Sequence, residues 1–194
     1  MRIPEYIAFM DYTTGNGKAA KWENKKREVS MKTREKEQLL SDYEHALEGI
    51  ELKMKGVPRE ALDFIPAIES AWSINEHLVH VFDADAICWY RLRVAIAEPG
   101  TTIPVWDQEL WRSKLAYSTF DGFKCLEEAT RLRQYLVSTY RELLNTDWSG
   151  YFVLHPERGR LDAAGILELY RDHPGFHLPY ITRNLDAWKA SGGA

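Results

Sequence analysis

Ser73-Ile74-Asn75-Glu76 opens the stretch SINEHLVHVFDADAICWYRLRVAIA (residues 73–97), which contains the clearest helix start in the chain. A serine followed three residues later by a glutamate is a capping box, in which each side chain accepts a hydrogen bond from the other residue's backbone N–H. The helix is predicted to end before Pro99-Gly100, because proline does not continue a helix and glycine commonly follows one. Its apolar residues form one stripe: Ile74, Leu78, Val81, Cys88, Leu92 and Ala95.

Three further segments show apolar residues at helical spacing, at about 33–55, 121–145 and 161–188. The first of them is predicted to stop at Gly56-Val57-Pro58. The region between the second and third long helices is predicted to be a connection that carries two tryptophans and a short helix at 107–116. Four long amphipathic helices and no convincing strand predict an all-α fold, a four-helix bundle.

The composition is that of one globular domain, with 194 residues, 45% of them hydrophobic and 28% charged. A net charge of −4 argues against nucleic-acid binding, which usually needs a basic surface. No apolar run approaches the roughly 18 residues of a membrane span. The N-terminus lacks a signal-peptide pattern, so we expect a cytoplasmic protein with no membrane span.

Residues 1–30 differ from the rest and are predicted to be an N-terminal extension to a bundle domain at 31–194. They contain a turn signal at Thr14-Gly15-Asn16-Gly17, followed by a lysine-rich stretch that we interpret as a solvated segment. Cys88 and Cys125 are far apart and have no metal-type spacing. Both fall in apolar helical stretches, where a free cysteine behaves as a small hydrophobic residue.

Two pairs of histidines have spacings that suit metal binding. His173 and His177 are four residues apart, which places both rings on one face of a helix, where they can bind one ion. His77 and His80, on the helix that begins at Ser73, each offer a third ligand. His77 lies closer to the apolar stripe by helical angle, so the spacing alone does not choose between the two.

The remaining candidates carry weaker signals. His45 and His155 have no partner at such a spacing, and we interpret them as surface residues.

A site of three neutral imidazoles would leave coordination positions open, as in catalytic sites. Zinc and nickel are the divalent ions expected first at such a site. Asp83 follows His80 by three residues and is a candidate for orienting an imidazole, although a solvated helix carboxylate fits the local pattern equally well.

Two blocks of the chain resemble the DinB-like family, also called DinB/YfiT-like metalloenzymes. The first block runs from Trp72 to Asp85, and the family typically has Trp-Ser, then Glu, then a metal histidine eight residues after the Trp, followed by acidic residues. This register selects His80 over His77. The second block is His155-Pro156-Glu157-Arg158-Gly159, followed by the helix with His173 and His177. The resemblance covers roughly residues 33–190.

The resemblance implies an up-down-down-up bundle with one long crossover, and often a homodimer. It also implies that His80, His173 and His177 hold a divalent metal. Some members are similar to S-transferases that use a low-molecular-weight thiol such as bacillithiol. The expected function is therefore a metal-dependent transferase or hydrolase that activates a thiol or water for a small-molecule substrate, with Asp83 orienting the ligands. The alternative is a non-catalytic small-molecule-binding or stress-response bundle with a degenerate site.

Pro174 and Pro179 depart from the family pattern, because both fall beside the paired histidines. Each proline removes a backbone donor and clashes with the preceding turn. The fourth helix is therefore predicted to bend or break between Asp172 and Tyr180, or to start again with Pro174 in its first turn. A buried carbonyl that loses its donor is expected to find another one.

Overall fold

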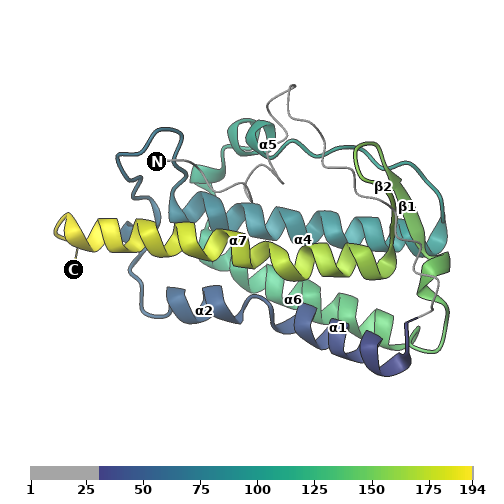
Figure 1. The fold of residues 1–194 in the computed structure, drawn as a ribbon. Coiled ribbons are helices and arrows are strands. Elements are labelled where there is room, and N and C mark those ends of the chain that lie inside the picture. The colour runs from purple at the N-terminus through teal and green to yellow at the C-terminus, as the bar shows by residue number, and fades with distance from the viewer. Residues whose placement is uncertain (1–30, 194) are drawn as a thin grey trace.

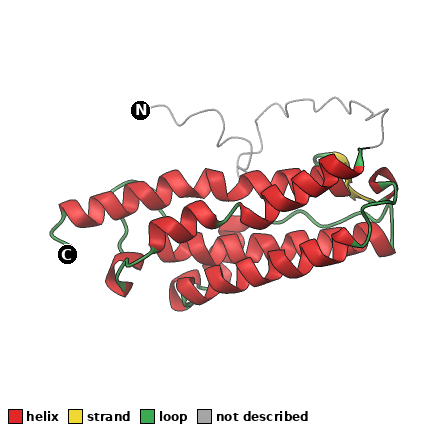
Figure 2. Cartoon of the chain, turned by 90° about the horizontal axis from the view of Figure 1, so that it is seen from below, coloured by secondary structure: helices red, strands yellow, loops and turns green. Residues whose placement is uncertain are grey.

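The computed structural model describes residues 31–193, so the predicted extension at 1–30 lies outside the described residues. The described chain is an elongated bundle of helices with one small hairpin at its end (Figures 1 and 2). The predicted all-α four-helix bundle is confirmed. The elements in chain order are α1 (Thr33–His45), α2 (Glu48–Met54), α3 (Arg59–Leu62), α4 (Ile74–Ala97), α5 (Gln108–Lys114), η2 (Tyr117–Thr119), α6 (Gly122–Arg141), η3 (Trp148–Gly150), β1 (Phe152–His155), β2 (Gly159–Asp162) and α7 (Ala163–Ala190).

The helix directions follow from the hydrogen bonds between helices. Bonds between α4 and α6 join residues whose numbers rise together: Asn75 with Gly122, Asp85 with Arg133, and Leu92 with Tyr140. Along α4 and α7 the numbers run in opposite directions: His77 with His177, and His80 with His173. They also run in opposite directions between the first helical segment and α6: Glu44 with Arg141, and Glu51 with Thr130. The order is thus up-down-down-up, and the connection from α4 to α6 returns along the bundle (Figure 1).

The start of α4 has the predicted capping box. Ser73 Oγ accepts from the backbone N–H of Glu76 at 3.1 Å, and the Glu76 carboxylate accepts from the N–H of Ser73 at 2.9 Å. Asn75 then links α4 to α6, because its side-chain oxygen accepts from the backbone N–H of Gly122 at 3.0 Å. Glycine is required there, since a Cβ at position 122 would lie only 2.7 Å from that oxygen.

The core has two main parts, and they meet where the paired histidines lie. On α7, the buried apolar residues of the first part end at Tyr170, and those of the second part are Ile181 and Leu185. His173 and His177 fall between them, so packing on both sides holds this section of the helix. None of the helices within residues 31–193 combines the length and apolar character that a membrane crossing needs.

The prediction that the chain has no strand was wrong, because β1 and β2 form an antiparallel hairpin. Val153 and His155 face inward and are buried, whereas Leu154 is exposed, which is the alternation of a half-buried strand. The turn ends at Gly159, whose φ of 71° suits glycine. Backbone bonds from Leu154 to Thr101 and Ile103 also tie the hairpin to the long crossover.

The predicted single helix over 33–55 is two helices, since α1 ends at His45 and α2 begins at Glu48. Its predicted apolar face is nevertheless buried: Tyr43, Leu47, Ile50 and Met54.

The helix was predicted to bend or break at the prolines, and the break does not occur; the bend stays a prediction. α7 is one helix from Ala163 to Ala190, with Pro174 and Pro179 inside it, so a new helix starting at Pro174 is also excluded. Each proline removes a single backbone bond. Packing of α7 against α4 and α1 holds the turns on both sides, and this packing outweighs the local loss.

Candidate metal centre

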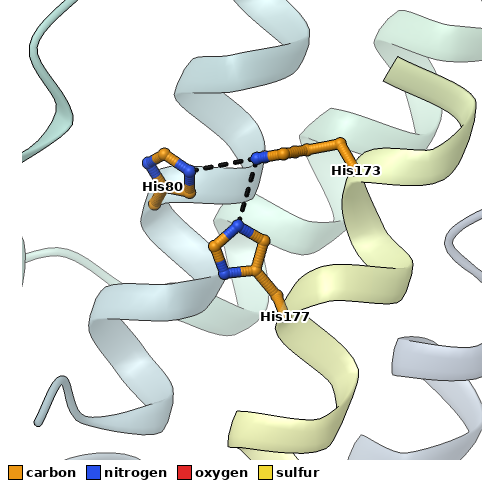
Figure 3. A group of neighbouring side chains, drawn as sticks. All are labelled: His80, His173 and His177. Atoms are coloured by element: carbon orange, nitrogen blue, oxygen red, sulfur yellow. Dashed lines mark hydrogen bonds between the residues drawn. The ribbon is translucent and has the colours of Figure 1, made fainter. Parts of the chain in front are cut away.

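His80 of α4 and His173 and His177 of α7 bring their rings together in the interior of the bundle (Figure 3). Nε2 of His173 lies 3.1 Å from Nε2 of His80 and 3.1 Å from Nε2 of His177. One nitrogen from each ring falls within a group whose members are at most 4.8 Å apart, and all three residues are buried. The two histidines of α7 share a face because they are four residues apart. The antiparallel contact with α4 supplies the third ring.

Burial decides the charge of these rings. It lowers the pKa of His177 to about 4. The pKa values of His80 and His173 lie well below the ordinary value, chiefly because of burial and further because of the neighbouring rings. At neutral pH all three imidazoles are therefore uncharged. Each ring then has one nitrogen with a free lone pair, which is the form that binds a metal.

The contacts among the three rings cannot all be hydrogen bonds. A ring nitrogen of a neutral imidazole either donates one proton or accepts one. Nε2 of His173 therefore pairs with only one of its two neighbours, His80 or His177. One divalent ion between the three lone pairs would satisfy all of them. Nitrogens bound to a tetrahedral ion at about 2.1 Å are about 3.4 Å apart, close to the separations found here. The three residues fit such an ion.

His77 lies directly behind this group. Its Nδ1 is 3.1 Å from Nδ1 of His177, on the side of that ring away from His173. The His77 ring stacks on Trp72 and on Tyr180, at centroid distances of 5.3 and 5.7 Å. If Nε2 of His177 keeps its lone pair for an ion, Nδ1 of His177 carries the proton and donates it to His77. The spacing left open whether His77 or His80 joins the paired histidines of α7. In the structure His80 lies in the three-ring group, and His77 contacts that group through His177.

A tryptophan of the long crossover covers the ring of His80, a feature that could not be predicted from the sequence. Trp106 stacks on His80 with a centroid distance of 5.0 Å and an angle of 11°, and Trp111 packs edge-on against Trp106. Trp72 packs edge-on against His80 from the start of α4. The indole rings thus contribute to the burial of His80, and burial is the main cause of its low pKa.

Asp83 does not take the orienting position suggested by its spacing. Its carboxylate accepts a hydrogen bond from the hydroxyl of Tyr117 in η2, and burial raises its pKa. Within residues 31–193 no hydrogen bond joins Asp83 to an imidazole. The physical reason is that η2 packs against α4 one turn beyond His80 and brings the hydroxyl of Tyr117 to this carboxylate.

The interpretation of His155 as a surface residue was wrong. It is 2% exposed, because it occupies an inward-facing position of β1. Its Nδ1 accepts from the backbone N–H of Glu157 at 3.2 Å, so this contact stabilises the hairpin turn. Burial lowers its pKa to about 4. His45 is exposed, as predicted, and its Nδ1 contacts the carbonyl of Ser41.

Comparisons with known proteins agree with this architecture. A protein of Oceanobacillus iheyensis, whose name provisionally describes a metal-dependent hydrolase, is 29% identical over 112 residues. That alignment covers 57% of this chain and 63% of the relative, so somewhat less than two thirds of the relative is matched. The structure is similar to that of YfiT from Bacillus subtilis, with a TM-score of 0.71 and 18% identity. The match covers 85% of this chain and 92% of YfiT, which is described as a probable metal-dependent hydrolase with an unusual four-helix bundle topology.

A family model supplies the remaining comparison. The model of the DinB superfamily matches residues 37–181, which include all four bundle helices in whole or in part and the three clustered histidines. The chain belongs to the DinB superfamily.

Proposed function

We propose that this protein is a metal-dependent hydrolase of a small-molecule substrate, with a divalent ion held by His80, His173 and His177. The observation that carries the proposal is the meeting of three buried, uncharged imidazoles at Nε2 atoms, two pairs of which are 3.1 Å apart. The descriptions of the Oceanobacillus relative and of YfiT support the same class of reaction.

A divalent ion at such a site supplies Lewis acidity and lowers the pKa of a bound water towards neutrality. The residues of the chain prepare the site for that chemistry. Burial keeps the three ligand rings uncharged at neutral pH, so no proton has to be displaced from the binding nitrogens. Three protein ligands leave at least one position for water or substrate. The crossover that carries Trp106 bounds the site and limits the entry of bulk water.

The thiol transfer suggested by the family resemblance would use the same histidines, since a thiol is also activated by a bound metal. The test is a metal titration followed by two assays on the reconstituted protein. Zn²⁺ or Ni²⁺ should bind to the chelator-treated protein with a stoichiometry of one. Metal-dependent cleavage of a panel of small esters and amides supports the hydrolase, whereas turnover only with an added low-molecular-weight thiol assigns the transferase. Metal binding without turnover in either assay leaves the non-catalytic role, and a chain that binds no metal contradicts the proposal.

A first prediction concerns His77. Replacing it with phenylalanine keeps the stacking between Trp72 and Tyr180 but removes the partner of His177 Nδ1. Partners of this kind typically contribute about 10–100-fold to metal affinity, so we expect a loss of that size for His77→Phe. The measurement is a competitive Zn²⁺ titration. His77→Gln, which retains a hydrogen-bonding group, should lose less, and equal affinities for all three proteins would show that the contact is irrelevant to binding.

A further inference from the structure

One backbone hydrogen bond is missing from the turn of α7 that carries His173. Pro174 has no N–H, so the carbonyl of Tyr170 has no donor four residues later. Both residues are buried, and an unpaired buried carbonyl costs about 1–3 kcal/mol. The structure supplies a donor from another helix, because Nη2 of Arg133 in α6 lies 2.9 Å from this carbonyl oxygen.

The same guanidinium contacts the other two helices of the bundle. Nε and Nη2 of Arg133 donate to the two carboxylate oxygens of Asp85 in α4, at 2.7 and 2.8 Å. Nη1 donates to the carbonyl of Tyr43 at 2.8 Å. Tyr43 lies in the last turn of α1, just before this helix ends. Both charged side chains are 0% exposed. These four donated bonds use the rigid, five-donor fork of arginine, which lysine cannot reproduce.

We propose that Arg133 is a positioning residue of the metal centre: held by Asp85, it replaces the bond that Pro174 removes and so fixes the turn of α7 that carries His173. This inference rests on the proposed metal site. His173 lies between Tyr170 and Pro174 in that same turn, and its Nε2 makes both of the short contacts among the three rings. Ligands must be held within about 0.5 Å of their productive positions, so a loosened turn would weaken the site.

A purely structural ion pair between Arg133 and Asp85 would make the same contacts. Substitution of Pro174 distinguishes this structural role from a role in positioning His173. If Arg133 stands in for a missing N–H, then an alanine at position 174, which has an N–H, should make that bond dispensable. Pro179 provides a matched control in the same helix. Its freed carbonyl belongs to Gly175, which is exposed and can bond to water, so Pro179→Ala should not compensate for a change at Arg133.

The experiment combines Arg133→Lys with each proline variant. Affinity for Zn²⁺ and the absorption spectrum of the Co²⁺-substituted protein report the ligand geometry, and the thermal midpoint of the metal-free protein reports the fold. Arg133→Lys should lower metal affinity by about 10–100-fold and alter the Co²⁺ spectrum. Adding Pro174→Ala should restore most of the affinity and the parental spectrum. Adding Pro179→Ala should restore neither.

Two outcomes would overturn the inference: parental affinity in Arg133→Lys, or equal recovery with the two proline variants. If Arg133→Lys does not fold, Asp85→Asn replaces it, because this milder change loosens the guanidinium without removing it, and the same pattern of rescue is expected. If the parent protein binds no metal, the proposed function fails separately. The thermal midpoints of the metal-free variants then still show whether residue 174 and Arg133 are coupled.

Discussion

No stoichiometric binding of Zn²⁺ or Ni²⁺ is expected in the His173→Ala variant. Nε2 of His173 makes both of the 3.1 Å contacts among the three rings, so its removal leaves two nitrogens without their common neighbour. We expect affinity to fall by about a thousandfold or more, which corresponds to about 4 kcal/mol of binding free energy. The measurement is metal content after dialysis, together with calorimetric titration.

The fold of this variant should persist, because the two parts of the core are built from apolar side chains on all four bundle helices. Far-ultraviolet circular dichroism should therefore match the parent protein. His45→Ala is the matched control, since this histidine is exposed and should leave binding unchanged. Parental metal binding by His173→Ala would remove this residue from the site. Unfolding of the parent by a chelator at room temperature would instead assign the ion a structural role.

The metal-free protein is expected to lose stability steeply as the pH falls from about 6.5 towards 4. Five histidines have pKa values below the ordinary 6.5, chiefly because of burial: His77, His80, His155, His173 and His177. The values for His155 and His177 are about 4. Between these values and 6.5 the unfolded chain binds protons that the folded chain does not, so acid favours the unfolded chain. The loss is complete only below the folded pKa values.

The effect should be large, since one pKa unit corresponds to about 1.4 kcal/mol and a domain has only about 5–15 kcal/mol of stability. Asp83 and Asp85 act in the opposite direction, because burial raises their pKa values and the folded chain binds their protons first. These two carboxylates therefore offset only part of the stability that the five histidines remove as the pH falls.

Urea unfolding of the metal-free protein between about pH 7 and pH 5 measures the slope of stability against pH, and thereby the protons taken up on unfolding. His155→Gln is a useful variant, because it removes one buried imidazole outside the metal centre and should reduce the slope by about one proton. A free energy of unfolding that stays constant over this range would show that the imidazoles titrate normally. Bound metal should raise the free energy of unfolding at each pH by mass action, but it should not reduce the slope, since it holds the ligand rings of the folded chain in their uncharged form.

Much of the fold could be predicted from the sequence, because the deciding interactions are local. The capping box at Ser73 and Glu76 involves residues three apart and is present as predicted. The shared face of His173 and His177 follows from the repeat of one helix. The family register, with a histidine eight residues after Trp72, pointed to His80, and this ring does meet the other two. The occupancy of the site by a metal remains a prediction.

Tertiary structure alone decided the features that depend on segments far apart in the chain. The strand that buries His155 is set by its pairing with β2 and the crossover, and the partner of Asp83 is a tyrosine 34 residues away. Local rules also predicted a break at Pro174, where one bond is indeed lost. The donor that replaces it at the carbonyl of Tyr170 comes from Arg133, 37 residues before Tyr170 and on another helix. Helical repeats and caps act within about one turn, whereas a buried carbonyl can take its hydrogen bond from any segment that folding brings against it.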